Sequence, residues 1–403
     1  MPYFPLPDSS IYYSLLVLFL LFSLFLLRAY IRERKYRRKP YFRFKSDVAQ
    51  VNLEAVTPPL YSLALLGDIG DINDSTHDPV MQLLRKWMDR QKENGAIILL
   101  GDNIYPIGLP PESHWRFPAA EQKLVAQVQL FQQHAGRVIY LSGNHDWNKA
   151  RPNGYSFMLR QQQYVQRFLN KPDCYLPLDG CPGPVALPLA PGLQLIVINT
   201  QWWVQRGVRP IGNGFGCGVE TVDDFFEKLR VLLEAHKHEQ IIIAAHHPLY
   251  SNALHGGKFT LKQHLFPLTA AHKRFYIPLP VAGSLYPAYR KLFGAYEDMS
   301  HPRYRRLRKR LLKEFRRHQN IIYVAGHDHN LQYFPMHGNH FVVSGSGSKT
   351  AFVRKGGRAD FTHEHRGFFV VDYYANKEVW LRVLEPILFA GETTEVVFAR
   401  RLA

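Results

Sequence analysis

Acidic, amide, phenol and imidazole side chains recur in this 403-residue chain directly after short apolar runs. These groups are metal ligands, and a pair of ions held by such ligands can clamp both oxygens of a phosphoryl transfer. A single motif of this kind is a common turn, but five in order favour one shared metal site. The five are Gly67-Asp68-Ile69-Gly70, Gly101-Asp102-Asn103-Ile104-Tyr105, Gly143-Asn144-His145-Asp146, His246-His247-Pro248 and Gly326-His327-Asp328-His329.

The apolar runs are predicted β-strands, and segments with helical periodicity lie between them. The alternation predicts an α/β layered domain, and such sheets build their sites at the carboxyl ends of strands. Glycines beside the ligands let the backbone turn sharply and bring carboxylates close to an ion. The predicted strands are 60–67, 95–102, 137–144, 193–200, 240–247, 320–327 and 340–347, and the predicted helices are 79–93, 119–134, 222–237 and 302–318.

The ordered motifs resemble the calcineurin-like metallophosphoesterase superfamily. Members usually open with Asp-x-His, whereas this chain has Gly70 at the histidine position and Tyr105 three residues after Asp102. That pattern is similar to the purple acid phosphatases, and residues 325–333, His246-x-Pro248 and His255-Gly256 resemble their small, mammalian-type members. The resemblance covers about residues 60–350 and implies a four-layer α/β/β/α metallophosphoesterase sandwich.

The resemblance further implies two coupled metal sites. The anionic ligands of site one suit Fe(III), whereas site two suits a divalent Fe, Zn or Mn ion. The implied reaction is hydrolysis of a phosphate ester through attack by a metal-bound hydroxide. Site one contains Asp68, Tyr105 and His329, site two contains Asn144, His246 and His327, and Asp102 bridges the two.

Three further residues are candidates for catalysis. His145 and His255 match the two non-ligand histidines of the family, which implies substrate binding or acid catalysis. Asp146 is a candidate to orient His145, and a role as a helix or turn cap is an equal alternative. Since 71 residues separate His255 from His327, more than in the small purple phosphatases, residues 256–302 are interpreted as an insertion. It forms either a lid or substrate wall near the site or a solvent-side decoration.

The net charge of +17 is concentrated in two stripes. Residues 28–45 and 302–318 each carry nine Lys or Arg against one Glu, so the rest of the chain is close to neutral. This distribution excludes a general basic coat, and no specific nucleic-acid partner is expected. The second stripe is interpreted as the solvated face of a helix, with attraction to anionic lipid as the alternative.

An uncharged, mostly apolar run of 19 residues, 9–27, predicts a single uncleaved transmembrane anchor and the lipid bilayer as a partner. Basic residues after the span favour a cytoplasmic catalytic domain, whereas the enzymes that the chain resembles are usually exported. The oligomeric state is left open. The expected parts are an N-terminal tail 1–8, the anchor 9–27, a basic juxtamembrane linker 28–58, a catalytic domain 59–390 and a C-terminal tail 391–403.

Three functions fit these patterns. The first is a membrane-anchored phosphatase of the purple acid type, and the second is a phosphodiesterase or pyrophosphatase on lipid-linked or nucleotide substrates. The third is a non-catalytic membrane binding module, against which the presence of all seven ligands argues. Cys174 and Cys181 flank a short loop and either pair or stay reduced, and three cysteines make no disulfide framework.

Replacement of Tyr105 by phenylalanine tests the assignment of iron to site one. A phenolate bound to Fe(III) gives the protein a visible charge-transfer band, and Tyr105→Phe is expected to lose it because the oxygen ligand is gone. Visible absorption spectra of the two purified proteins measure the difference. A band that survives the substitution refutes Tyr105 as the iron ligand.

Overall fold

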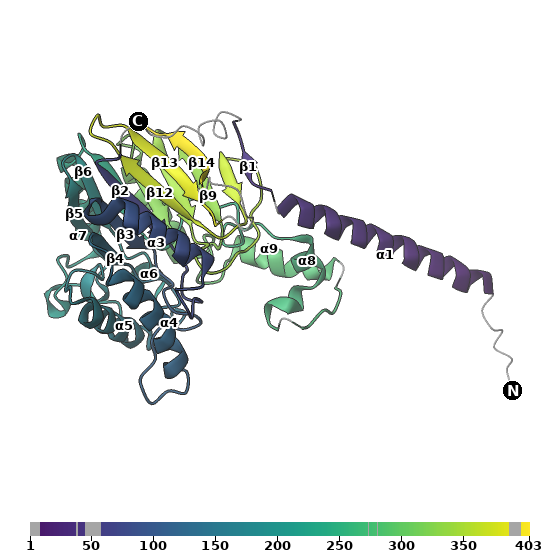
Figure 1. Cartoon of the computed structure of the whole chain (residues 1–403). Helices are drawn as coiled ribbons and strands as arrows, with labels where there is room; N and C mark the ends of the chain where they lie inside the picture. The colour runs from purple at the N-terminus through teal and green to yellow at the C-terminus, as the bar shows by residue number, and fades with distance from the viewer. Residues whose placement is uncertain (1–8, 38, 45–57, 273, 280, 387–395) are drawn as a thin grey trace. The chain divides into compact units, whose positions relative to one another are not determined.

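The computed structural model describes residues 9–37, 39–44, 58–272, 274–279, 281–386 and 396–403. They fall into two units, Met1–Pro40 and Tyr41–Ala403. The first contains helix α1 (Ser9–Arg37), of which Tyr12–Arg37 is long and apolar enough to cross a membrane (Figure 1). The helix continues past residue 27, the last residue of the predicted anchor, because Arg and Lys are good helix formers and favour a helix C-terminus. The helix therefore takes up the first part of the predicted linker.

Two β-sheets form the centre of the second unit (Figure 1). Strands β2 (Tyr61–Leu66), β3 (Gly95–Leu99) and β4 (Arg137–Tyr140) are parallel neighbours in the six-stranded sheet. Strands β6 (Leu193–Val197), β7 (Gln240–Ala244), β8 (Ile322–Ala325) and β10 (Asn339–Ser344) are parallel neighbours in the eight-stranded sheet. All seven predicted strands are present, and the carboxyl ends within each group lie at one edge.

The remaining strands complete the sheets in the orders β1-β11-β9-β10-β8-β7-β6-β5 and β14-β13-β12-β2-β3-β4. Two of them correct the predicted parts of the chain, since β1 lies in the predicted linker and β14 in the predicted C-terminal tail. They pair antiparallel with β11 and β13, respectively. The strands are β1 (Tyr41–Phe42), β5 (Val185–Ala190), β9 (Leu331–Met336), β11 (Phe361–His363), β12 (Phe368–Tyr373), β13 (Val379–Leu384) and β14 (Val396–Arg401).

Alternate side chains of the strands enter different cores, which produces four layers. In β2, Leu63 and Leu65 face the core between the sheets, whereas Ala64 and Leu66 face the core beneath the first helical layer. Strands buried on both faces read as continuous apolar runs. That layer holds α3 (Pro79–Gln91), α4 (Phe117–Phe131) and α5 (Gly154–Leu169), and the opposite layer holds α6 (Gln201–Val204), α7 (Val222–Ala235) and α10 (Pro302–Phe315). The predicted α/β/β/α sandwich is confirmed.

Helix α10 carries the second charge stripe. Its apolar side chains recur at helical spacing and are buried against the eight-stranded sheet, while arginines occupy the outer face. One of these, Arg310, pairs with Asp223 at the start of α7 at 2.7 Å. The buried side chains are Tyr304, Leu307, Leu311, Leu312 and Phe315.

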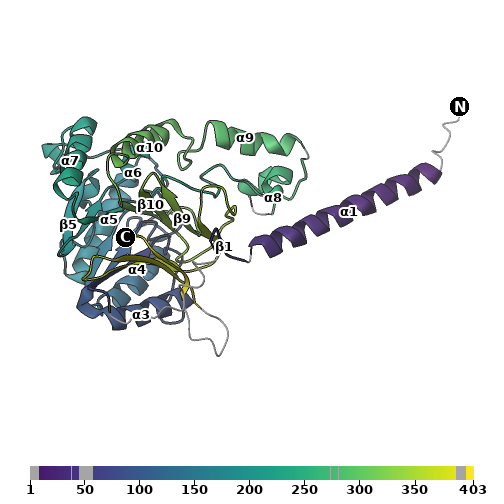
Figure 2. The ribbon, with the colours of Figure 1, turned by 90° about the horizontal axis from the view of Figure 1, so that it is seen from above.

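The insertion forms two short helices, α8 (Leu261–Leu265) and α9 (Leu285–Leu292), with 3-10 turns η5 (Pro267–Ala270) and η6 (Ala282–Ser284). Figure 2 shows α8 and α9 beside each other at the margin of the second unit. A capping box at Thr260 and Gln263 starts α8, and His264 bonds Ser284 Oγ at 3.0 Å. The described residues of the insertion therefore form a folded lobe.

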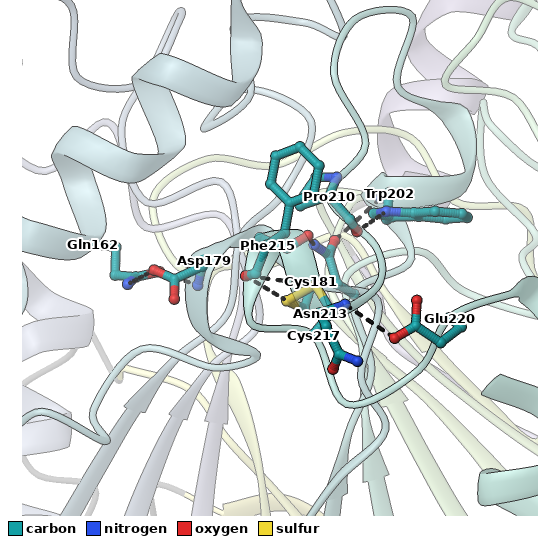
Figure 3. Close-up of a disulfide and its surroundings, with 11 residues drawn as sticks. Gln162, Asp179, Cys181, Trp202, Pro210, Asn213, Phe215, Cys217 and Glu220 are labelled. Atoms are coloured by element: carbon teal, nitrogen blue, oxygen red, sulfur yellow. Dashed lines mark hydrogen bonds between the residues drawn. A yellow bond between two sulfur atoms is a disulfide. The ribbon is translucent and has the colours of Figure 1, made fainter. Parts of the chain in front are cut away.

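The cysteine pairing differs from the one considered from the sequence. Cys181 forms a disulfide with Cys217 (Figure 3), whereas Cys174 is free and buried. Cys174 is fixed beside β4, because its carbonyl accepts from Tyr140 N at 2.7 Å, and this placement keeps it in the core. Cys181 instead faces the loop after η4 (Asn213–Phe215).

Loss of the disulfide tests how much it stabilises this region. The bond closes a sequence separation of 36 residues, so Cys217→Ser is expected to lower the free energy of unfolding by about 2–4 kcal/mol. Denaturant unfolding of both proteins, with and without a reductant, measures the change. The reductant is expected to destabilise the wild type alone, and an equal effect on Cys217→Ser would contradict the assigned pairing.

Candidate metal centre

Seven side chains with metal-binding atoms meet where strands of both sheets end. Three lie in the loops after β2, β3 and β4, and the others lie after β7 and β8 or a few residues further along the same loops. All are buried except His329, whose side chain is 25% exposed. The structure brings together every predicted ligand: Asp68, Asp102, Tyr105, Asn144, His246, His327 and His329.

The first cluster surrounds the phenol oxygen of Tyr105. This oxygen lies 2.7 Å from Asp68 Oδ1, 3.2 Å from Asp102 Oδ2 and 3.0 Å from His329 Nε2. Burial, followed by the charges of Asp68 and Asp102, raises the pKa of Tyr105 well above its ordinary value. The phenol therefore keeps its proton in this environment, and a phenolate requires a strongly charged cation among these carboxylates.

The second cluster consists of three atoms that carry lone pairs. Asn144 Oδ1 lies 3.0 Å from His246 Nε2 and 3.1 Å from His327 Nδ1, and the two ring nitrogens are 3.2 Å apart. The other nitrogen of each ring faces a carbonyl, Leu100 O at 2.7 Å for His246 and Glu297 O at 2.8 Å for His327.

These outer partners determine which atoms of the second cluster are protonated. A ring nitrogen that faces a carbonyl must donate, so in the neutral rings the inward nitrogens of His246 and His327 are acceptors. Asn144 Nδ2 donates to Glu297 Oε1 at 3.1 Å, which turns the amide oxygen inward as well. Three acceptors at this separation repel one another unless a cation lies between them, so the donor set fits a metal ion.

Asp102 lies between the clusters. Its Oδ2 faces Tyr105 in the first cluster, and its Oδ1 lies 3.5 Å from His246 Nε2 in the second. Burial opposes its ionisation, but His145 and His246 lower the pKa of Asp102 to about 2. The carboxylate is thus ionised and can bridge two cations.

His247 is a further imidazole near this cluster. Donor atoms of His246, His247 and His327 lie within 4.8 Å of one another. However, His247 Nδ1 bonds Thr200 Oγ1 at 2.9 Å, and burial lowers its pKa well below the ordinary value. Asn144 therefore completes the second cluster better than His247 does, since its inward oxygen already meets both of the other donors.

Three of the predicted ligands have strained backbone conformations. Asp68, Asp102 and His327 have φ angles of 61°, 56° and 72°, in the left-handed region that non-glycine residues rarely occupy. Close approach of the loops adds a second constraint, because a Cβ on Gly143 would lie 2.3 Å from Asp102 Oδ1. Gly143 therefore allows neighbouring loops to approach each other, in addition to the predicted role of glycine in turning the chain.

The two predicted catalytic histidines lie on either side of the clusters. His145 Nε2 lies 3.8 Å from Asp102 Oδ2, and its Nδ1 bonds Pro106 O at 2.6 Å. The ring of His255 lies 4.1 Å from the ring of His327, and its Nδ1 bonds Asp298 Oδ1 at 3.0 Å. Burial opposes protonation of His255, but the bond to Asp298 raises its pKa to about 9.

Asp146 does not orient His145, so that prediction is wrong. Its carboxylate instead accepts backbone N–H groups of Asp102, Asn103 and Gly143 at 2.9, 3.0 and 2.7 Å. It thereby fastens the loop that carries Asp102 to the loop that carries Asn144. The carbonyl of Pro106 orients His145, and the cap-like alternative for Asp146 is the better description.

Three residues near the clusters were not predicted. Glu297 and Asp298 come from the insertion, and they are the only acidic residues between residues 256 and 302, which is the signal that points to them. Lys349 lies in the loop after β10, with its Nζ 3.2 Å from the centroid of the Tyr105 ring. Nothing in the sequence around Lys349 singles it out.

Comparisons with known proteins bear on the family and the fold of this chain. The sequence model of the calcineurin-like phosphoesterase family matches residues 61–331. The structure resembles that of GAP50, the anchor in the inner membrane complex of Plasmodium, at 15% identity, covering 85% of this chain and 88% of that chain with a TM-score of 0.51. At this identity the likeness concerns the fold alone.

Two further solved structures are less similar. For purple acid phosphatase PPD1 from yellow lupin (Lupinus luteus) seeds, the identity is 12%, the coverage 85% of this chain and 53% of that chain, and the TM-score 0.46. For PhoD the corresponding values are 11%, 86%, 73% and 0.49. None of the curated proteins that were compared matches the sequence.

The bond between His255 and Asp298 predicts a pH dependence. Because the pKa of His255 is raised in the folded protein, protonation of this ring stabilises the fold. The stabilisation is complete below the ordinary histidine pKa and is lost as the pH rises through about 9. Asp298→Asn is expected to return the pKa of His255 to the ordinary histidine value or below, because burial then acts without a facing carboxylate. An NMR titration of the His255 ring measures this shift, and an unchanged titration in the variant would contradict the assigned cause.

Proposed function

Because the chain belongs to the calcineurin-like phosphoesterase family, we propose that it is a membrane-anchored phosphoesterase with two metal ions, of the purple acid phosphatase type. Family membership, which the sequence motifs predicted, makes a phosphate ester the expected substrate. The observation that carries the proposal is the second cluster, where His246, His327 and Asn144 direct three acceptor atoms at one point.

The proposed ligands form two sets that differ in their donor atoms. Asp68, Tyr105 and His329 would hold a trivalent iron, Asn144, His246 and His327 a divalent ion, and Asp102 would contact both. When bound, such ions neutralise charge on the phosphoryl group and lower the pKa of water. The proposal thus assigns the chemistry of activation to the clusters and the handling of protons to the side chains around them.

His255 is the proposed general acid. Its pKa of about 9 keeps it protonated at neutral pH, and Asp298 occupies Nδ1, so the remaining ring proton is on Nε2. In the proposed reaction Nε2 donates this proton to the leaving alkoxide. His145 lies beside the first cluster, where its Nε2, 3.8 Å from Asp102 Oδ2, would contact the phosphoryl group, and Lys349 supplies an ammonium beside the same cluster.

The proposed anchor is α1. Its apolar segment has the length of a bilayer core, and the basic residues of its last turn, Arg34, Lys35 and Arg37, would lie at the headgroups. The charge asymmetry favours a cytoplasmic domain, whereas the Cys181–Cys217 disulfide favours an oxidising compartment. A charge bias only shifts the preferred orientation of the anchor, whereas formation of a disulfide requires an oxidant. We therefore propose that the domain lies on the oxidising side of the membrane.

Metal analysis of single-site variants tests the two-site proposal. The wild type is expected to bind two ions per chain, His329→Ala and His246→Ala are each expected to lose one, and Asp102→Ala is expected to weaken both. Each variant is expected to lower kcat/KM for a phosphomonoester by more than about a hundred-fold. This loss is larger than the one expected when a residue that only hydrogen-bonds a metal ligand is replaced. Metal content by mass spectrometry and hydrolysis of p-nitrophenyl phosphate measure these effects.

Two controls complete this experiment. His238→Ala removes an exposed histidine and is expected to change neither metal content nor activity. A parallel assay with bis-p-nitrophenyl phosphate separates a phosphomonoesterase from a phosphodiesterase. Wild-type protein that holds no metal after reconstitution would contradict the proposal and favour a non-catalytic binding module.

A further inference from the structure

The insertion exposes an unusual number of apolar side chains. In the described part of the second unit, eleven of the eighteen exposed large hydrophobic residues lie between residues 261 and 296. Val281 is 89% exposed, and Leu285 is 72% exposed. The eleven, which we call the apolar lobe surface, are Leu261, Leu268, Phe275, Tyr276, Ile277, Val281, Leu285, Tyr289, Leu292, Phe293 and Tyr296.

Helix α9 shows that this exposure is built into the lobe. Leu285, Tyr289 and Leu292 recur at helical spacing, yet they face solvent, whereas the equivalent stripe of α10 is buried. The inner side of α9 is fixed by Arg290, which forms an ion pair with the buried carboxylate of Asp298. The helix is thus held with its apolar stripe outward.

The charge of the same segment has one sign. Residues 257–296 contain six Lys or Arg and no Asp or Glu. Lys262 stacks on the ring of Tyr276 with its Nζ 4.6 Å from the centroid, so cations and aromatic rings are interleaved on this surface. Aromatic and aliphatic side chains mixed with Lys and Arg match the interface of an anionic membrane, with a nonpolar layer below and phosphate groups above.

A short connection joins the proposed membrane anchor to the second unit. Only residues 38–40 separate the end of α1 from β1, a connection of about 10–15 Å at full extension. Just after β1, Arg43 donates to Gly357 O at 2.5 Å, and the adjacent Gly356 O accepts from Asn252 Nδ2 at 2.8 Å, at the base of the insertion. Figures 1 and 2 both show β1 on the same side of the second unit as α8 and α9.

We infer that the apolar lobe surface docks on an anionic phospholipid bilayer and holds the metal centre beside phosphate esters carried by lipids. The lobe that carries this surface also supplies Glu297 and Asp298 to the centre, so a docked lobe places the clusters near the headgroups. The inference rests on the proposed anchoring of the chain. Its lipid-substrate part also rests on the proposed hydrolysis, whereas docking itself does not.

Fluorescence quenching in vesicles tests the docking. Full-length protein with Val281→Cys carries an environment-sensitive dye at residue 281 and is reconstituted in vesicles of equal parts phosphatidylcholine and phosphatidylglycerol. Native cysteines should not react, because Cys174 is buried and the other two are paired. The matched control is Trp115→Cys, since Trp115 is also apolar and is 77% exposed. It shortly precedes α4, and that helix lies away from α8 and α9 in Figures 1 and 2.

Lipid-borne nitroxide is expected to quench the dye at residue 281 at least about three-fold more strongly than the dye at residue 115. Equal quenching at the two positions overturns the inference. So does a dye at residue 281 that is shielded from both lipid-borne and water-soluble quenchers, because that result indicates a protein partner. Protein that does not float with the vesicles overturns both the anchoring and the docking.

A second variant links docking to the substrate. Leu285→Asp/Leu292→Asp places two carboxylates on the outward stripe of α9, away from the clusters. It is expected to abolish the extra quenching and to lower hydrolysis of phosphatidic acid in vesicles about ten-fold, with soluble p-nitrophenyl phosphate hydrolysed as by the wild type. Equal losses on both substrates overturn the lipid-substrate part. If neither protein hydrolyses either substrate, the proposed function fails, while the quenching still decides docking.

Discussion

The repulsion among three inward-facing lone pairs is the constraint on which this structure depends. When their rings are neutral, His246 and His327 each present an acceptor to the same small volume as the amide oxygen of Asn144, because the outer hydrogen bonds use the donors of all three side chains. Without a cation the arrangement is unfavourable, because buried acceptors need a donor or a positive charge. The fold must therefore hold these groups in place before an ion arrives, and the rest of the molecule can be understood as the means of doing so.

Several parts of the fold share that task. Parallel strands in both sheets end at one edge, the ligand loops take strained left-handed conformations, and Asp146 fastens two of those loops by their backbone N–H groups. Strain of this kind persists only where the surroundings determine the conformation. The cores on both sides of each sheet provide that rigidity, since residues such as Leu63 and Leu66 are completely buried on opposite faces of one strand.

The sequence allowed prediction of the sandwich and of seven proposed ligands that the structure brings together, because these residues follow strands closely and their motifs are local. It did not reveal what depends on distant contacts. Asp146 is three residues from Gly143 in sequence, yet most of its partners come from the Asp102 loop. Cys181 does not pair with Cys174, which is nearer in sequence but is held beside β4. It pairs with Cys217 instead. Strands β12, β13 and β14 carry no ligand motif, so the motifs did not predict them.

The carbonyl of Glu297 has a consequence that reaches beyond the metal centre. It accepts from His327 Nε2, so the position of the lobe determines the proton position and orientation of a proposed ligand. A segment that takes part in two binding equilibria links them thermodynamically, and the linkage is reciprocal. Any contact of the lobe that changes the affinity of the clusters for an ion is itself changed by that ion by the same factor. The insertion thus connects whatever touches its outer surface to the orientation of His327.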